Sequence, residues 1–511
     1  MTRYLLGIDV GTTNVKAAIY TTEFLKEAEA FSEYPTYFPH TGWAEQNAEH
    51  WWAAAVDALK KSVAASSINL KNIQGICVSS QAPAVLPVDC DGLPLRNALI
   101  WMDRRSEAQC GYLRKHVTQE KIASITGNRV DPYFALSKLL WFKEKEPGAY
   151  GKAYKILQVN GYINFRLTGR FTCDKVHASL MGLYDVNRLS WSEELCTLLD
   201  LKPELLPQVF EATDIIGTVS REASLAMGLP EGIPVVAGNV DASSSALEAG
   251  VAGTGEAVEM TGTSTVLMLG CDQWHSSINL VSMFHPIKGH SLLIGPISST
   301  GASLKWYRDQ LGSDEKRRAA ELNMDPYKYM DLQAAGAAPG SGGLVFLPYM
   351  AGERAPIWDS RARGVFFGLT HSTTRSQMIR AILEGSSFAL YHNMEEAEKS
   401  GLAVEKLRAV GGGSESRLWL QIKASVINKP VVTLANSSNG TFGNILLAGC
   451  GTNIYGDVRE VLEKNVKFKE VFQPDLTLHK HYQKLYRVYR SLYDHIKDDF
   501  RQLEEITPGG E

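Results

Sequence analysis

The sequence has few cysteines and arranges none of them for metal binding. The chain contains 7 cysteines, no two of which form a C-x-x-C pair, and no histidine cluster lies near them. Zinc sites and disulfide-rich domains require such groupings. We therefore expect reduced structural thiols, as in a cytoplasmic protein, and neither a zinc site nor a disulfide framework.

A charge excess and long apolar runs are also missing. The formal net charge is −4, so the chain has no electrostatic footprint for nucleic acid or anionic lipid. No uncharged apolar stretch reaches the roughly 18 residues of a membrane span, and no signal-peptide pattern precedes the first apolar run. We expect a cytoplasmic protein that has neither nucleic acid nor membrane as a partner.

The sequence contains enough apolar residues for two large domains. The 511 residues are 44% hydrophobic, and this length exceeds what one ordinary core supports. Apolar runs alternate with helical patterns, which predicts α/β layers. The predicted strands are 4–10, 14–20, 75–80, 235–240, 256–260 and 265–269, and the predicted helices are 47–65, 301–311, 374–397, 415–427 and 478–506. The glycine-rich stretch 250–255 predicts a boundary between domains 1–249 and 250–511.

The first candidate site is the turn in "GIDVGTTNVK". Gly11 permits a tight turn, and the backbone N–H groups and hydroxyls of Thr12 and Thr13 can bind phosphate oxygens. Asp9 ends a buried strand, where an unpaired carboxylate is costly. A Mg²⁺ ion, bound directly or through water, would satisfy it. A plain hairpin with one buried polar residue is the alternative.

The second half repeats this chemistry in "TGTS", which contains Gly262, Thr263 and Ser264. One such turn alone would indicate an exposed hairpin, but two turns in corresponding places would hold a polyphosphate from both sides. A third glycine-rich stretch, "VGGGSESRLWLQ", precedes a helix whose N-terminus would favour negative charge. It lacks the lysine of a Walker A loop, and a simple turn before a helix explains it equally well.

Asp241 lies in "AGNVDASSSALEAG", where a predicted strand gives way to a helix. A carboxylate here can take the proton of a hydroxyl that attacks a γ-phosphate. The alternative is a helix N-cap, which the spacing alone favours.

Taken in order, these segments resemble the FGGY carbohydrate kinases of the actin-like ATPase superfamily. The resemblance covers essentially the whole chain, with 364–384 similar to the family's C-terminal signature, and is carried by "GIDVGTTNVKA", "PHTGWAEQNAEHWW", "WMDRRS", "TGNRVDPYFALSKLLW", "GTST", "AGERAPIWDSRARGVFFGLT", "RAILEG" and "VGGGSESRLWLQI". It implies two actin-like (ribonuclease H-like) α/β domains with a nucleotide and sugar cleft between them. It also implies ATP and Mg²⁺ as cofactors, and a homodimer is among the assemblies of relatives.

The resemblance also implies roles for individual residues. Asp241 matches the catalytic base, and Asp9 matches the acidic residue near Mg²⁺. The phosphate- and nucleotide-side positions are Gly11, Thr12, Thr13, Lys16, Gly262, Thr263, Ser264, Gly301, Lys305, Gly411, Gly412, Gly413 and Ser414. The sugar-side positions are Gln81, Asp103, Arg105 and Tyr133, together with Asp241.

Several departures from the family pattern concern the sugar. Xylulokinases typically read Gln-Met-His-Gly where this chain has Gln81 followed by "APA", and the Arg-Glu pair of glycerol kinases is absent. Ala135, Ser425 and the turn 160–162 also differ from common family residues. Changes in a sugar-binding wall can alter specificity by orders of magnitude.

The sequence thus predicts ATP-dependent phosphorylation of a hydroxyl, primary by preference, on a small sugar or polyol. A ketopentose such as xylulose is the first expectation. Ribulose, erythritol, glycerol or gluconate as the substrate, and a catalytically silent sugar-binding regulator, remain alternatives. An actin-like filament or chaperone ATPase is a rival that would share the two phosphate turns but would not need Asp241 or "WMDRRS".

Overall fold

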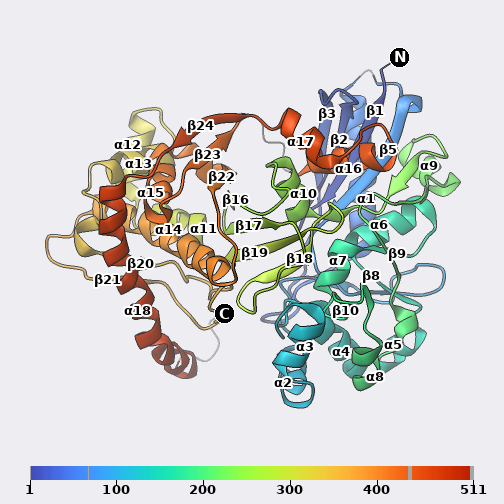
Figure 1. Ribbon diagram of the computed structural model, residues 1–511, viewed down its shortest axis with the longest axis horizontal. Helices are drawn as coiled ribbons and strands as arrows, with labels where there is room; N and C mark the ends of the chain where they lie inside the picture. Colours follow the sequence, from blue (N-terminus) through green and yellow to red (C-terminus); the bar gives the residue numbers. More distant parts are fainter. Residues whose placement is uncertain (1, 67, 436–439, 507–511) are drawn as a thin grey trace.

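The computed structural model describes residues 2–66, 68–435 and 440–506 and contains two large sheets (Figure 1). The first sheet has the order β13-β14-β5-β1-β2-β3, with β15 also paired to β5. Its strands are β1 (Tyr4–Val10), β2 (Asn14–Thr21), β3 (Lys26–Glu33), β5 (Ile73–Ser80), β13 (Ile215–Thr218), β14 (Pro234–Val236) and β15 (Asn239–Val240). The central strands β1 and β5 are buried along almost their whole length, as their apolar runs predicted.

The second sheet has the order β18-β19-β17-β16-β22-β23-β24. Its strands are β16 (Glu256–Thr261), β17 (Thr265–Cys271), β18 (Val281–Phe284), β19 (Ser291–Ile297), β22 (Lys406–Val410), β23 (Val431–Leu434) and β24 (Phe468–Phe472). Each sheet has an antiparallel hairpin, β1–β2 or β16–β17, whose first strand pairs in parallel with β5 or β22. The predicted repetition of one α/β arrangement in the two halves is confirmed.

Helices α1 (Ala48–Ala64) and α6 (Val159–Thr168) pack on the first sheet. The first half also contains further helices and short pairs of strands. Helix α1 is capped by the Asn47 side chain, which accepts a hydrogen bond from the Glu49 N–H. The further helices are α2 (Glu107–His116), α3 (Gln119–Thr126), α4 (Ala135–Lys145), α5 (Pro147–Lys152), α7 (Lys175–Leu180), α8 (Glu193–Leu198) and α9 (Arg221–Met227). Short paired strands join them: β4 (Glu45–Gln46) with β7 (Ala98–Leu99), β6 (Leu86–Val88) with β8 (Lys155–Leu157), β9 (Thr172–Asp174) with β12 (Gln208–Phe210), and β10 (Tyr184–Asp185) with β11 (Ser190–Trp191).

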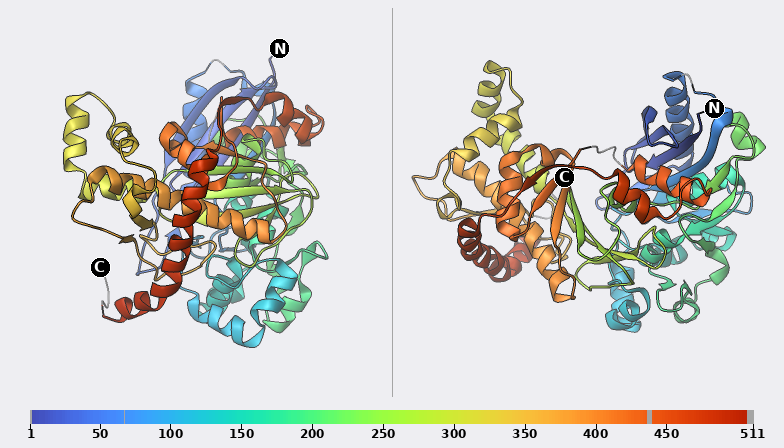
Figure 2. Two further views of the ribbon diagram at one scale, coloured as in Figure 1. Left: turned by 60° about the vertical axis from the view of Figure 1, so that its left-hand side comes forward. Right: turned by 45° about the horizontal axis from the view of Figure 1, so that its top comes forward.

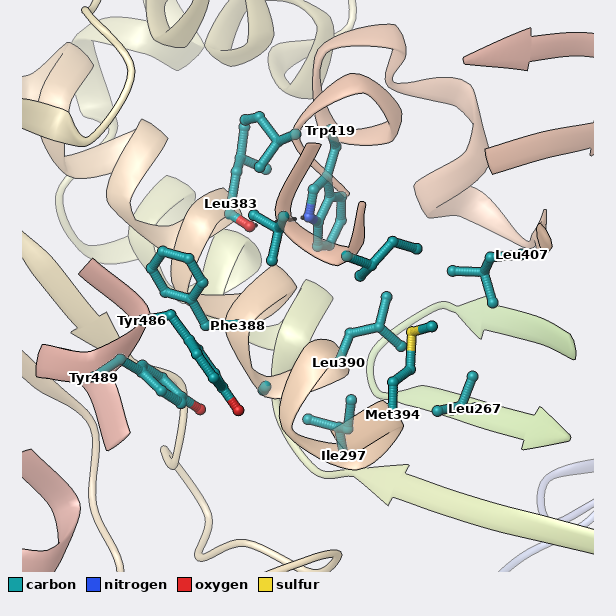
Figure 3. Packing of buried hydrophobic residues seen from close by; sticks show 14 of the residues in the cluster. Leu267, Ile297, Leu383, Phe388, Leu390, Met394, Leu407, Trp419, Tyr486 and Tyr489 are labelled. Atoms are coloured by element: carbon teal, nitrogen blue, oxygen red, sulfur yellow. Dashed lines mark hydrogen bonds between the residues drawn. The ribbon is translucent and has the colours of Figure 1, made fainter. Parts of the chain in front are cut away.

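The second half has its own core between its sheet and long helices (Figure 3). Trp419 is part of this core and donates its indole N–H to the Leu383 carbonyl at 3.1 Å. Tyr486 and Tyr489 of the last helix pack against Phe388, so the aromatic side chains on this side of the helix belong to the core. The helices are α11 (Thr300–Gln310), α12 (Ser313–Glu321), α13 (Pro326–Ala335), α14 (Arg375–Lys399), α15 (Arg417–Ile427) and α18 (Leu476–Ile506), with the strand pair β20 (Val345–Leu347) and β21 (Val365–Phe367).

Two helices cross between the halves. Helix α10 (Asp241–Glu248) packs against α16 (Thr441–Gly451), and α16 in turn packs against β1 and β5 of the first sheet. Figures 1 and 2 show α16 and α17 (Val458–Asn465) beside the first sheet although they follow the second in sequence. The sequence boundary at 249/250 therefore remains a prediction. In space, α16 of the second half packs on the sheet of the first half.

One predicted strand is interrupted. The segment 235–240 forms β14 and β15 with a break at Gly238, where φ is +82°. A Cβ atom at this position would lie 2.0 Å from the Val78 carbonyl oxygen. After the break, β15 pairs with β5 in a shifted register, and Asp241 follows β15 directly. Among the described residues, no helix is both long and apolar enough to cross a membrane.

Substitution of Gly238 by alanine should cost far more stability than the same change at Gly228. Gly228 also has a positive φ, +76°, but an added Cβ there has no atom within 4 Å. We expect Gly228→Ala to lower the free energy of unfolding by about 1–2 kcal/mol, from backbone strain alone. Gly238→Ala adds a backbone clash and should lower it severalfold more, as measured by urea unfolding. Equal losses in the two variants would contradict this account.

Candidate active site

Asp9 and Asp241 lie at the same edge of the first sheet. Asp9 stands opposite Ser79 on β5, and the strand before Asp241 pairs with β5 on its other side, through Asn239 and Ser79. All three strands run parallel, so their carboxyl ends meet, and such an edge is where open α/β sheets bind ligands. The N-cap of α10 is Val240, which has no side-chain capping bond. The Asp241 carboxylate accepts a hydrogen bond from the N–H of the next residue, Ala242, at 2.6 Å, which does not fit the N-cap alternative.

The two carboxylates oppose each other's ionisation. Burial raises the pKa of Asp9, although the Ser79 hydroxyl donates to its Oδ1 at 2.7 Å and Lys16 contributes an opposing charge. Burial, and then the charge of Asp9, raise the pKa of Asp241 to about 7. Asp9 Oδ2 accepts no hydrogen bond from any described residue. A pair of neighbouring carboxylates with raised pKa values is relieved by a divalent cation, so these residues fit the Mg²⁺ ion that was expected.

The first phosphate turn is fixed through its carbonyl groups. The Tyr34 hydroxyl donates to the Gly11 carbonyl, and the Tyr34 N–H donates to the Thr13 carbonyl at 3.1 Å. The Gln46 amide donates to the Thr12 carbonyl at 2.8 Å. The N–H groups of Thr12 and Thr13 have no hydrogen-bond partner in the described part of the chain. Such oriented, unoccupied N–H groups can bind the oxygens of a phosphate.

The second turn is also held through a carbonyl group, but a buried ion pair lies beneath it. The Thr263 carbonyl accepts the Ala302 N–H at 2.8 Å, and a Cβ on Gly301 would lie 2.0 Å from the Gly262 carbonyl oxygen. Beneath the turn, Lys423 forms an ion pair with Glu259 at 2.5 Å and donates to the Thr261 hydroxyl at 3.2 Å. Both charged side chains are at most 2% exposed. A buried ion pair therefore holds the base of this turn.

Some of the expected nucleotide-side positions, all from the second half, meet around a cavity of about 550 Å³, whose lining does not include Ser264, Gly411 or Ser414. The cavity is lined by Gly262, Thr263, Gly301, Lys305, Gly412, Gly413, Asp325, Tyr327 and Trp419, among others. The glycine loop contacts the second turn, since a Cβ on Gly413 would lie 2.5 Å from the Thr261 side chain. Ser414 donates its hydroxyl to the Gly411 carbonyl and shapes this loop.

A second cavity, of about 250 Å³, has the expected sugar-side residue Tyr133 in its wall, and we refer to it as the sugar-side cavity. The expected residue Tyr133 lines it together with Trp101, Arg354 and Trp358, which the sequence reasoning did not single out. Trp101 donates its indole N–H to the Thr12 hydroxyl at 3.1 Å, and the Arg354 guanidinium lies 5.6 Å from the Trp101 ring centroid. The segments "WMDRRS" and "AGERAP" carried the signal for Trp101 and Arg354, but only as parts of a family pattern.

Asp103 and Arg105 lie in a different place from the one expected. They form an ion pair at 2.8 Å, are at most 1% exposed and do not line the sugar-side cavity. Arg105 also pairs with Glu45 and stacks 3.6 Å from the Trp43 ring centroid. This cluster supports the cavity wall from behind, and Arg104 lines the cavity instead. Gln81, 2% exposed, donates to the Gln46 side chain at 2.6 Å, behind the first phosphate turn.

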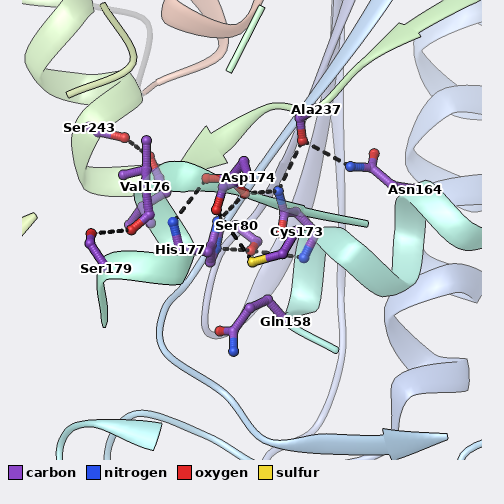
Figure 4. Close-up of polar contacts among 12 residues, drawn as sticks. Ser80, Gln158, Asn164, Cys173, Asp174, Val176, His177, Ser179, Ala237 and Ser243 are labelled. Carbon is purple, nitrogen blue, oxygen red and sulfur yellow. Dashed lines mark hydrogen bonds and ion pairs between the residues drawn. The ribbon is translucent and has the colours of Figure 1, made fainter. Parts of the chain in front are cut away.

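A buried hydrogen-bond chain lies behind the end of β5 (Figure 4). His177 bonds to Asp174 at 2.6 Å through Nδ1 and to the Ser80 hydroxyl at 3.0 Å through Nε2. The order resembles that of a hydrolase triad, but the three side chains are at most 1% exposed. No substrate reaches them, so the chain is structural and fixes the strand end from which Gln81 follows.

Two family models match the chain, in sequence order. The N-terminal domain model of the FGGY family of carbohydrate kinases matches residues 4–248, and the C-terminal domain model matches residues 257–452. The chain belongs to the FGGY family of carbohydrate kinases. As in that family, ATP is the phosphoryl donor and a small sugar-like molecule is the acceptor.

Two relatives whose names give different substrates share the same sequence identity with this kinase, over different lengths. A xylulose kinase of Bacillus subtilis is 30% identical, with 97% of this chain and 98% of the relative covered. A gluconokinase of the same organism is also 30% identical, with 88% and 87% covered. The crystal structure of a ligand-bound xylulose kinase from Lactobacillus acidophilus superposes with a TM-score of 0.91 at 27% identity, covering 98% of this chain and 100% of that one. The interpretation as an actin-like filament or chaperone ATPase is set aside.

Removal of one partner of the ion pair beneath the second turn should strongly destabilise the kinase. Lys423→Met leaves the Glu259 carboxylate buried without its cation, and we expect a loss of about 3–5 kcal/mol in calorimetric or denaturant unfolding. Lys61→Met breaks the exposed pair with Asp57 and should cost less than about 1 kcal/mol. The double variant Lys423→Met/Glu259→Met should recover part of the loss. A loss for Lys423→Met no greater than that of Lys61→Met would contradict the supporting role.

Proposed function

We propose that this kinase transfers the γ-phosphoryl group of ATP to a primary hydroxyl of a ketopentose, with xylulose as the first candidate. The observation that carries the proposal is the position of Asp241, a carboxylate with a raised pKa beside Asp9 at the sheet edge that also bears the first phosphate turn. The similarity to xylulose kinases over nearly the full chain supports the choice of acceptor. A cytoplasmic location and a homodimer belong to the same proposal and rest on the resemblance alone.

Each residue has a definite task in this mechanism. The free N–H groups of Thr12 and Thr13, and the turn that contains Thr263, bind oxygens of the β- and γ-phosphates. Asp241 accepts the proton of the sugar hydroxyl as its oxygen attacks the γ-phosphorus. Asp9 would hold Mg²⁺, directly or through water, and the ion would neutralise phosphate charge. Most of the rate acceleration then comes from positioning and fixed charge.

Water must be kept from the γ-phosphate, since it is also a nucleophile. The sugar-side cavity is walled by Trp101 from the first half and by Arg354 and Trp358 from the second. A sugar bound there joins the two halves, which favours a closed cleft when the correct hydroxyl is present.

A sugar acid is the second candidate acceptor, because of Arg354. Its guanidinium forms no hydrogen bond or ion pair with the described residues, and burial lowers its pKa. The neighbouring Glu353 has its pKa raised by burial to about 7, so it neutralises the arginine only in part. A carboxylate on the acceptor would pair with this cation. The similarity to gluconokinase is consistent with such a substrate.

A coupled ADP-release assay over D-xylulose, L-xylulose, D-ribulose, L-ribulose, erythritol, glycerol and D-gluconate tests both candidates. We expect the largest kcat/KM with a ketopentose. If gluconate is preferred instead, Arg354→Gln should reduce kcat/KM for gluconate at least tenfold more than for neutral sugars. ATP hydrolysis that is equally fast with and without every sugar would contradict the kinase mechanism.

Asp241→Asn should abolish phosphoryl transfer and at the same time stabilise the fold near neutral pH. The amide cannot take a proton, so we expect kcat to fall at least 1000-fold while nucleotide binding survives. In the wild type the folded-state pKa of Asp241 lies above its unfolded value, so ionisation costs stability as pH rises towards 7. Scanning calorimetry should therefore show a higher Tm for the variant at pH 8, with a difference that shrinks towards pH 5. A lower Tm for the variant at pH 8 would contradict the assigned environment.

The pH dependence of catalysis should report the same group. Protonated Asp241 cannot act as a base, so kcat/KM for the sugar should fall about tenfold per pH unit below the pKa of Asp241, which is about 7 without a cation and lower once Mg²⁺ is bound beside it. The profile is measured with a sugar that carries no ionisable group. A rate that stays constant from pH 8 to below the ordinary pKa of an aspartate, about 3.9, would exclude Asp241 as the base.

A further inference from the structure

Asn444 on the crossing helix α16 bonds to both elements that carry the acidic pair. It is fully buried, and its Nδ2 donates to the Ile8 carbonyl at 2.9 Å and to the Ser79 hydroxyl at 2.8 Å. Its Oδ1 lies 2.8 Å from the Ser244 hydroxyl, whose single hydrogen it shares with the Gly440 carbonyl, also at 2.8 Å. The amide thus has a hydrogen-bond partner for both of its donor hydrogens and for its oxygen.

The chemistry of the partners fixes the direction of the bonds to Ile8 and Ser79. A backbone carbonyl can only accept, so the atom of Asn444 that faces Ile8 is the amide nitrogen. That nitrogen also donates to Ser79, which leaves the Ser79 hydroxyl hydrogen for Asp9 Oδ1 at 2.7 Å. The result is a directed chain from Asn444 through Ser79 to Asp9, and it ends on a carboxylate as acceptor.

The oxygen of Asn444 reaches the element that bears the other acid. Ser244 lies three residues after Asp241 on α10, which is close to one helical turn. Helices α10 and α16 are in direct contact there, because a Cβ on Gly443 would lie 2.3 Å from the Ser244 carbonyl oxygen. Rotation or translation of α10 relative to β1 would therefore break bonds to Asn444.

We propose that Asn444 is a positioning residue that fixes the separation of Asp9 and Asp241. It contacts neither acid, and it acts through Ser79 and Ile8 on one side and through Ser244 on the other. The functional consequence rests on the proposed roles of the two acids. Residues that orient the groups around a metal site typically contribute 10–100-fold to metal affinity or activity.

The test compares Asn444→Leu with Asn393→Leu, both of which remove a fully buried amide and keep a similar volume. Asn393 lies on α14 and bonds to the carbonyls of Ala355 and Ala389, away from both acids. We expect both variants to lower the Tm. Only Asn444→Leu should reduce kcat, by about 10–100-fold, with a smaller change in KM for the sugar.

Calorimetric titration with ADP provides a readout that does not depend on turnover. Binding without Mg²⁺ should be the same in the wild type and in Asn444→Leu. The increase in affinity that Mg²⁺ gives the wild type should fall about 10-fold or more in the variant. An unchanged Mg²⁺ effect together with an unchanged kcat would reduce Asn444 to a structural residue and overturn the proposal.

A double-mutant cycle separates a shared network from separate effects. If Asn444 acts through Ser244, adding Ser244→Ala to Asn444→Leu should cause little further loss, because contacting residues are not additive. Full additivity of the two effects would overturn the proposed path. Should the wild type phosphorylate none of the sugars tested, the proposed function fails, and the Mg²⁺-dependent ADP titrations still decide the role of Asn444.

Discussion

The site depends on holding two carboxylates side by side at a buried sheet edge. Burial and mutual repulsion disfavour the charged forms of Asp9 and Asp241, as their raised pKa values indicate. Left to themselves, such groups would separate or take up protons. The strand pairing of β1 and β15 on the two sides of β5, and the hydrogen bonds to Ser79, prevent this separation. Burial of these two acids lowers the stability of the fold, and the packing of the surrounding core compensates for this loss.

The two phosphate turns are held in place by different kinds of interaction. In the first, polar side chains, Tyr34 and Gln46, hold the carbonyl groups and leave N–H groups free. In the second, a buried ion pair between Lys423 and Glu259 supports the base of the turn, and Gly301 allows α11 to approach closely. The common requirement is a rigid backbone whose donors already point at the anion, because ordering them during the reaction would cost activation free energy. The two halves therefore share a topology without sharing the residues that stabilise it.

In the mechanism that we propose, selectivity for the acceptor depends on a surface drawn from both halves. Trp101 and Tyr133 come from the first half, and Arg354 and Trp358 come from the second, around one cavity. Trp101 also touches the first phosphate turn through its bond to Thr12. A sugar that contacts this wall is thus mechanically connected to the turn that binds phosphate. This connection gives a physical route by which the acceptor can influence phosphoryl transfer.

The sequence by itself determined the repeated strand–turn–strand units, the glycine loop and the aromatic stripe of the last helix. These features are local, because hydrophobic periodicity and turn residues act over a few positions. The family motifs added the acids, but they could not distinguish Arg104, which lines the sugar-side cavity, from Arg105, which is buried against Trp43. The break at Gly238 and the bond between Asn444 and Ile8, residues 436 positions apart, were decided only by the tertiary structure. The physical reason is that these contacts join elements whose relative placement depends on packing across the whole chain, and no short stretch of sequence encodes it.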